Sequence, residues 1–219
     1  MAYTLSNCTV VGIVGTVGVG KSTVAQLLKN RYGFVVFNFA DELKLTINKW
    51  FGIPLDVVYG ASERKDARVR TMMQLLGTEY GREFDPDVWV RLFMRRLHAY
   101  VTTGIDPLGL VPAITTQMHP PRIAVGDVRF PNEAEVISTL PGGHVIRIIK
   151  ELPITSPDMT AEQHQHASET SQNLIHLDHV EHTLFNNGSL DQLAAQLFAI
   201  LSRMEQHLNS IIPEEACND

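Results

Sequence analysis

A short stretch near the start of the chain has the residue types and spacing that bind phosphate. It reads GTVGVGKS and fits the pattern G-x4-G-K-S/T, the phosphate-binding loop or P-loop. Its glycines, Gly15, Gly18 and Gly20, let the backbone curl so that successive N–H groups point inward at one phosphate. Lys21 would then reach the β- and γ-phosphates of ATP, and the hydroxyl of Ser22 would bind Mg²⁺.

The residues on either side of the P-loop favour the same interpretation. Residues 10–14 form a short, largely β-branched run typical of a strand buried on both faces. Ser22 and Thr23 open a stretch of helical spacing that reaches Lys29, and the positive N-terminal end of this helix would also bind ATP. The motif requires a strand before it and a helix after it, so we favour ATP binding over a glycine-rich turn with a surface lysine.

P-loops occur in GTPases, motors, ATPases and small-molecule kinases, so other residues must distinguish these classes. The sequence lacks the guanine-reading motif Asn-Lys-x-Asp, because its nearest candidate, NNGS at 186–189, has neither the Lys nor the Asp. No expected strand ends in a paired Asp-Glu that would polarise water for ATP hydrolysis, and the chain is short for a motor. These features favour a kinase that transfers the γ-phosphoryl group to a small acceptor.

A group of cations could bind a phosphate on that acceptor. Residues 64–96 contain Arg64, Lys65, Arg68, Arg70, Arg82, Arg91, Arg95 and Arg96. The planar guanidinium group suits phosphate, and two anions need neutralisation before they approach within reacting distance. The alternative is a solvated helix face balanced by nearby acids, but for the group as a whole we favour a phosphate-binding surface.

Another polar group follows a predicted buried strand at 123–125. Asp127, Arg129 and Glu133 come shortly after it, where open α/β sheets bind their ligands. Asp127 could hold Mg²⁺ directly or through water, and Arg129 could clamp a phosphate. The alternative is a structural Asp–Arg ion pair with Glu133 as an ordinary acid at a helix N-terminus.

The elements that must position these residues alternate between strand and helix. Further strands are expected at 34–39, 145–149 and 180–185, and helices at 41–50, 132–140 and 189–205, the last with Ser189 as its cap. Residues 63–99 are expected to be mainly helical with breaks at Gly77 and 84–86, and 103–121 to be a long surface loop.

This alternation predicts an α/β fold of P-loop kinase type: a three-layer parallel sheet with helices on both faces. We expect a single domain over 1–219. Within it, 41–121 would form a helical acceptor-binding insertion and 151–178 a long, lid-like loop.

The composition limits the classes of protein that remain. The chain has 219 residues, 44% of them hydrophobic, which suits one α/β domain and excludes a disordered or coiled-coil protein. A net charge of −6 argues against long nucleic acid as a partner, although clustered cations can still bind small anions. Two cysteines near opposite ends, no signal-peptide pattern and no apolar run of membrane-spanning length predict a cytoplasmic protein with no membrane partner.

Taken together, several motifs resemble the phage deoxynucleoside monophosphate kinases, P-loop enzymes related to the broader nucleoside monophosphate kinases. The resemblance rests on the P-loop, MQLLGTE at 73–79, WVRLF at 89–93, DVR at 127–129 with Glu133, HASE at 166–169 and NNGSL at 186–190. These motifs occur in the family's order and cover nearly the whole chain.

The resemblance implies ATP- and Mg²⁺-dependent phosphorylation of a deoxynucleoside 5′-monophosphate to the diphosphate, with a dGMP-like purine favoured. Trp89 would pack on or beside the acceptor nucleotide. The residues implied to contact or lie near this acceptor are Leu43, Lys44, Arg70, Gly77, Asp127, Arg129 and Glu133. A homodimer is also consistent with the resemblance, and the location would be the host-cell cytoplasm if a phage encodes the chain.

The P-loop departs from the relatives' pattern at two points. Relatives carry basic residues inside it, where residues 16–19 read TVGV, and some have Asp where this chain has Ser22. The first difference shifts neutralisation of the acceptor phosphate to Arg70 and Arg129, and the second makes the Mg²⁺ site more conventional. Lys21, with these arginines and Asp127, is expected to support in-line transfer to an acceptor phosphate that is already dianionic at neutral pH.

The histidines near the end of the chain and Trp89 each allow more than one interpretation. Five histidines, His164, His166, His176, His179 and His182, have spacing that fits neither a helical metal pair nor a zinc finger. A solvated segment is the favoured interpretation, and the alternative is a role for His166 and Glu169 in closing over the nucleotide. Trp89 could equally be a core residue of an amphipathic helix.

Two other functions stay open from the residues alone. One is a P-loop kinase for another small acceptor, such as dephospho-coenzyme A, phosphomevalonate or a nucleoside. The other is a non-kinase P-loop ATPase acting on nucleic acid, which the net charge of −6 disfavours.

Overall fold

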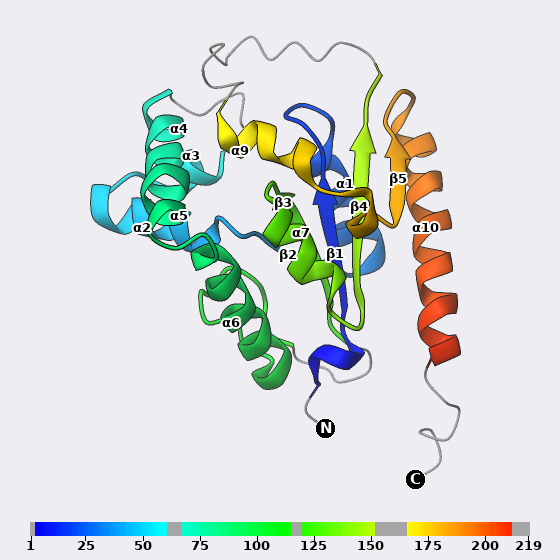
Figure 1. Cartoon of the computed structure of the whole chain (residues 1–219). Helices are drawn as coiled ribbons and strands as arrows, with labels where there is room; N and C mark the ends of the chain where they lie inside the picture. The colour runs from blue at the N-terminus through cyan, green and yellow to red at the C-terminus, as the bar shows by residue number, and fades with distance from the viewer. Residues whose placement is uncertain (1–2, 61–66, 115–119, 152–165, 212–219) are drawn as a thin grey trace.

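A computed structural model describes residues 3–60, 67–114, 120–151 and 166–211, which form three layers around one sheet (Figure 1). The strands are β1 (Thr9–Val14), β2 (Val35–Phe37), β3 (Arg122–Val128), β4 (Gly143–Ile149) and β5 (His182–Phe185). All neighbours are parallel, in the order β2-β3-β1-β4-β5. The expected α/β class with a parallel sheet is confirmed.

Helical segments fill the connections between the strands. The longer helices are α1 (Lys21–Tyr32), α2 (Asp41–Phe51), α4 (Ala67–Gln74), α6 (Val88–Thr103), α7 (Pro131–Ser138) and α10 (Leu190–Ile211). The shorter ones are α3 (Leu55–Tyr59), α5 (Gly81–Phe84), α9 (Ala167–Thr170), the 3₁₀ turns η1 (Leu5–Asn7), η4 (Ser171–Leu174) and η5 (Leu177–His179), and the π-helical η3 (Leu75–Tyr80). Among the described residues, no helix is both long and apolar enough to cross a membrane.

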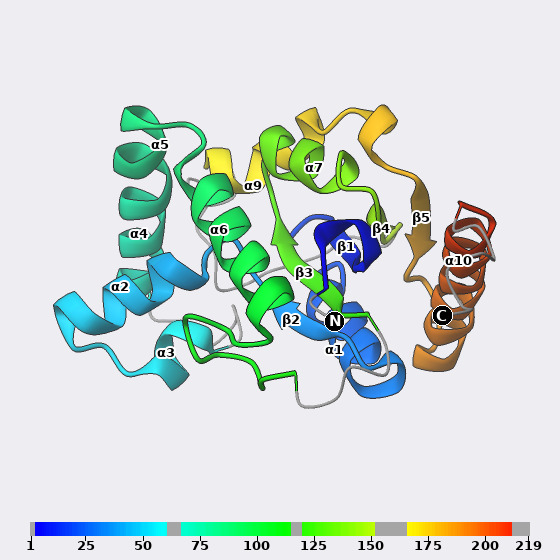
Figure 2. The ribbon, with the colours of Figure 1, turned by 90° about the horizontal axis from the view of Figure 1, so that it is seen from below.

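The central strand β1 is buried on both faces, and its alternating side chains join two cores. Val11 and Ile13 pack with residues of α1 and α10, whereas Val10 and Val14 pack with residues of α6 and α7. Figure 2 shows α1 and α7 on opposite sides of the sheet. This burial explains why the strand reads as a continuous apolar run in the sequence.

A third, smaller core holds the helices beside the sheet together. Leu43, Ile47 and Val58 are buried there, and Trp89 packs against them. The predicted break at Gly77 is wrong, because α4, η3 and α5 run without interruption from residue 67 to 84. Gly77 is buried, and a Cβ on it would lie 2.7 Å from Leu43 Cδ2, so close packing against α2 accounts for this glycine.

One predicted loop is confirmed and another differs from the structure. Residues 104–114, in the expected surface loop at 103–121, contain no helix or strand and are exposed or half-buried except for Asp106, which accepts hydrogen bonds from three loop amides; 115–119 lies outside the described residues. In the predicted lid-like loop at 151–178, the part from residue 167 onward forms α9, η4 and the start of η5, and 152–165 lies outside the described residues. Short polar helices lack the apolar periodicity by which longer helices are recognised.

Candidate active site

The P-loop joins the end of β1 to the start of α1, at the edge of the sheet where the strands end (Figure 1). Gly18 and Gly20 have φ of +77° and +107°, a region that disfavours residues with a Cβ. At Gly15 the limit is space, because a Cβ would lie 2.9 Å from the carbonyl oxygen of Ile148. The glycines of the motif are therefore each required by the backbone of this loop.

The start of α1 is arranged as an anion site. Gly20 is its N-cap residue and supplies no side-chain hydrogen bond to the first turn, which leaves the first-turn amides available to a phosphate. The ammonium group of Lys21 donates to the carbonyl oxygens of Gly15 and Thr16, the latter at 2.9 Å, so it lies across the loop. Ser22 is exposed beside it, as a magnesium ligand must be.

The structure adds Asn186 to this site, a residue that the sequence analysis placed in a motif but gave no role. Asn186 follows β5, and its Nδ2 donates to the carbonyl oxygen of Val19 at 2.9 Å. A Cβ on Gly20 would lie 2.5 Å from this amide nitrogen. Asn186 thus braces the P-loop from a strand that lies more than 160 positions along the chain.

Asp127, at the end of β3, binds the connection between β2 and α2. One carboxylate oxygen accepts the Phe39 N–H at 2.9 Å and the other accepts the Ala40 N–H at 3.1 Å. Burial raises the pKa of Asp127, while the charge of Lys44 opposes that shift. The carboxylate therefore has a structural task here, and its role toward Mg²⁺ stays a prediction.

Glu133 lies at the N-terminus of α7 and caps that helix, which was the alternative to a role at the acceptor. It is buried and accepts the backbone N–H groups of Arg129 at 2.7 Å and Phe130 at 3.1 Å, at the start of α7. It also pairs with Arg82, whose guanidinium lies 3.7 Å from the centre of the Phe130 ring. Burial raises the pKa of Glu133 to about 7 in spite of this pairing. A contact to an acceptor stays a prediction.

Several members of the expected arginine group pair with carboxylates of the chain. Arg96 is buried, 2.5 Å from Asp41 and in a bidentate pair with Asp106 at 2.7 and 2.8 Å. Further pairs join Arg82 to Glu133, Arg91 to Asp85 and, at 3.7 Å, Arg95 to Glu42. A buried guanidinium must have an anionic partner, and here the chain supplies it.

Of the four remaining cations in this group, the structure describes two. Arg68 is exposed and Arg70 is half-buried, both on α4. Arg64 and Lys65 lie outside the described residues. A role for Arg70 at the acceptor phosphate therefore stays a prediction.

The structure brings Leu43, Gly77 and Trp89 together inside the helical group beside the sheet. The indole Nε1 of Trp89 donates to the carbonyl oxygen of Gly77 at 2.6 Å, so its polar edge is already used. Lys44 Nζ lies 4.6 Å from the centre of the Tyr59 ring. These contacts match the core interpretation of Trp89, and stacking beside an acceptor stays a prediction.

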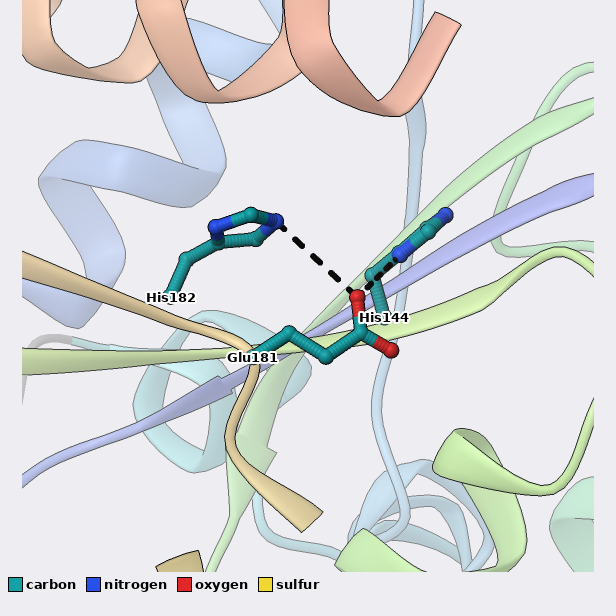
Figure 3. Close-up of side chains that lie close together, drawn as sticks. All are labelled: His144, Glu181 and His182. Atoms are coloured by element: carbon teal, nitrogen blue, oxygen red, sulfur yellow. Dashed lines mark hydrogen bonds and ion pairs between the residues drawn. The ribbon is translucent and has the colours of Figure 1, made fainter. Parts of the chain in front are cut away.

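The histidines divide into separate groups. His166 Nε2 lies 3.4 Å from Glu79 of η3, so the chain just before α9 reaches the helical group (Figure 1). His182 instead lies near His144 and Glu181 (Figure 3). His164 and the side chain of Glu169 lie outside what the structure describes.

The chain has similarities to known proteins in sequence and in fold. No protein-family model matches the chain. The "Putative deoxynucleotide monophosphate kinase" of Acanthamoeba polyphaga mimivirus is 28% identical over 204 residues, which cover 90% of this chain and 97% of the relative.

Among solved structures, TT1252 from Thermus thermophilus is 19% identical with a TM-score of 0.50, over 90% of this chain and 98% of that one. Shikimate kinase from Aquifex aeolicus is 10% identical with a TM-score of 0.45, over 90% and 99% of the two chains. The chain is thus similar over most of its length to the mimivirus protein, and it shares its α/β fold with TT1252.

Proposed function

We propose that this protein transfers the γ-phosphoryl group of ATP to a deoxynucleoside 5′-monophosphate and forms the diphosphate and ADP. The observation that carries the proposal is a complete P-loop in a chain whose similarity to the mimivirus relative extends over 90% of its length. A dGMP-like purine as acceptor, and a homodimer as the assembled form, belong to the same proposal and rest on the family resemblance.

The P-loop residues fit ATP with Mg²⁺. A Cβ at Gly15 would clash with Val19 and Ile148 and one at Gly20 with Asn186, so the loop needs both glycines to keep its shape, and no side chain caps the start of α1. Lys21 would bind the β- and γ-phosphates, and Ser22 would hold Mg²⁺, which supplies positive charge against the phosphate oxygens. These groups would stabilise the charge that develops on the γ-phosphoryl group during transfer.

The acceptor needs positioning more than activation. A nucleoside monophosphate has a second pKa of about 6, so one of its phosphate oxygens can attack the γ-phosphorus at neutral pH without a general base. The bond from the γ-phosphorus to the β,γ-bridging oxygen breaks, and ADP leaves. Arg129 follows β3 at the sheet edge that holds the P-loop, so we assign it and Arg70 to the acceptor phosphate, with Asp127 supporting the metal.

Release of ADP, measured in a coupled assay, tests the proposal. We expect release with deoxynucleoside monophosphates and none with dephospho-coenzyme A, phosphomevalonate or DNA. Lys21→Met should lower turnover by about 10²- to 10³-fold with the circular dichroism spectrum unchanged. Near-normal turnover in this variant, or release only with another acceptor, would contradict the proposal.

The acceptor assignment has its own test. Arg129→Gln should raise the KM for the deoxynucleoside monophosphate by about tenfold, the loss of one charged hydrogen bond, and leave the KM for ATP unchanged. Arg31→Gln is the matched control, because Arg31 is exposed in the last turn of α1. Equal effects of the two variants would remove Arg129 from the acceptor site.

A further inference from the structure

Three side chains of metal-binding type meet where β5 begins beside β4. His144 lies near the start of β4, His182 is the first residue of β5, and Glu181 immediately precedes it. One ligand atom from each residue lies within 4.8 Å of the other two. The histidine spacing in the sequence does not indicate this cluster, because His144 is 38 positions before His182.

The three side chains point at a common centre. His144 Nδ1 lies 2.5 Å from Glu181 Oε2, and His182 Nε2 lies 3.9 Å from the same oxygen. Figure 3 shows a nitrogen of each ring directed at this carboxylate oxygen. His144 is buried, and its other ring nitrogen, Nε2, has no hydrogen-bond partner among the described residues. The ring nitrogen that faces the cluster is Nδ1, and Nε2 points away from the carboxylate (Figure 3).

The backbone already fixes this arrangement. Ile146 of β4 pairs with His182 of β5, so His144, two residues before Ile146, lies on the same face of the sheet as His182. The Glu181 N–H donates to the carbonyl oxygen of Val145 at 3.1 Å, which holds Glu181 between the two histidines. Metal–ligand bonds of about 2.1 Å in tetrahedral geometry need ligand atoms about 3.4 Å apart, so side-chain rotation alone would suffice.

We propose that His144, Glu181 and His182 bind one transition-metal dication of the zinc class and thereby tie the start of β5 to β4. Two imidazoles and a carboxylate suit Zn²⁺, Co²⁺ or Ni²⁺, whereas Mg²⁺ and Ca²⁺ require oxygen ligands. This site is separate from the Mg²⁺ expected at Ser22 and does not depend on the proposed function. A fourth coordination position would be filled by water.

A positive neighbour limits the strength of this site. The charge of Arg203 of α10 acts on the ring of His182 and would oppose a cation. With one anionic ligand and this positive neighbour, we expect a dissociation constant on the order of micromolar.

Cobalt titration of the full chain tests the site. After removal of any affinity tag and chelation of bound metal, Co²⁺ should bind at one equivalent per chain, with the visible absorption of a four-coordinate site. Zn²⁺ should displace it, and millimolar Mg²⁺ should not. Saturating Zn²⁺ at about 100 times the dissociation constant should raise Tm by several degrees.

Variants distinguish metal binding at this site from metal binding by other histidines of the chain. Glu181→Gln and His182→Gln should each weaken binding at least tenfold and lose the Tm increase. His176→Gln is the control, because His176 is exposed and pairs with Asp178 at 2.9 Å, and it should bind like the unaltered chain. Absence of binding at 100 times the expected dissociation constant would overturn the proposal. So would equal binding by all three variants, provided that their metal-free forms unfold at the same temperature as the unaltered chain.

Discussion

At the scale of single residues, the P-loop depends on a partner that its own motif does not contain. Asn186 donates to the Val19 carbonyl and lies against Gly20. The motif predicted Gly15, Gly20 and Lys21 because their roles are local to the loop. The role of Asn186 could not be predicted, since it depends on β5 ending beside the loop in space.

Asn186→Ala should therefore weaken ATP binding without unfolding the protein. The loss of one hydrogen bond to the loop, about 1.4 kcal/mol, corresponds to a tenfold increase in the dissociation constant, which calorimetry measures. Asn187→Ala is the control, because its Oδ1 accepts the Glu151 N–H at 2.9 Å, outside the P-loop. Equal affinities for ATP in the two variants would show that the loop does not need this brace.

The second prediction at this scale concerns the pH dependence of stability. Burial raises the pKa of Glu133 from its ordinary value of 4.5 to about 7. Between these values the folded protein holds the proton more tightly than the unfolded chain does. The free energy of unfolding therefore falls as the pH rises through this window, and the full cost of the buried charge is present above pH 7.

Glu133→Gln removes this titration. From pH 5 to pH 8, the stability of the unaltered protein should fall relative to the variant by about 2 kcal/mol in urea unfolding. Parallel pH profiles for the two proteins would show that the carboxyl group titrates normally.

At the scale of elements, one buried ion network joins α2, α6 and the loop after α6, next to the core in which β2 and α6 pack together. Arg96 of α6 binds Asp41 at the start of α2 and Asp106 in the following loop, and it lies 3.9 Å from the centre of the Phe37 ring of β2. Asp41 also accepts the Asn38 N–H at 3.0 Å. This network holds the connection that Asp127 binds from β3, and so supports the site edge.

Arg96→Met should leave two buried carboxylates without their cation and destabilise the fold by about 3–5 kcal/mol in urea unfolding. Arg91→Met, which breaks the exposed pair with Asp85, should change stability little. Similar effects of the two variants would mean that the network contributes no more than a surface pair.

The elements differ in how well the sequence predicts them. For α10, two local signals are confirmed: the buried stripe of Leu193, Leu197 and Leu201, and the cap in which the Ser189 hydroxyl oxygen accepts the Gln192 N–H. Arg96 was included in the predicted phosphate-binding surface because its carboxylate partners, Asp41 and Asp106, do not lie next to it in the sequence. Gly77 was assigned to a break because its contact with Leu43 is made across two helices.

At the scale of the whole molecule, the parallel sheet carries two different groups of polar residues. The P-loop and Arg129 lie where strands end, and the His144, Glu181 and His182 cluster lies where β4 and β5 begin. The alternation of strand and helix predicted the sheet and its P-loop edge. The cluster of His144, Glu181 and His182 was not predicted, because strand register brings together residues whose spacing in the sequence carries no pattern.

The central claim, phosphoryl transfer to a deoxynucleoside monophosphate, is tested most directly by following the phosphate itself. The protein would be incubated with Mg²⁺, deoxynucleoside monophosphates and ATP carrying radioactive phosphorus at the γ-position, and the products separated by chromatography. We predict that the label appears in the β-phosphate of a deoxynucleoside diphosphate, with one ADP formed for each. Label released as inorganic phosphate, or none transferred to any deoxynucleoside monophosphate, would contradict this account.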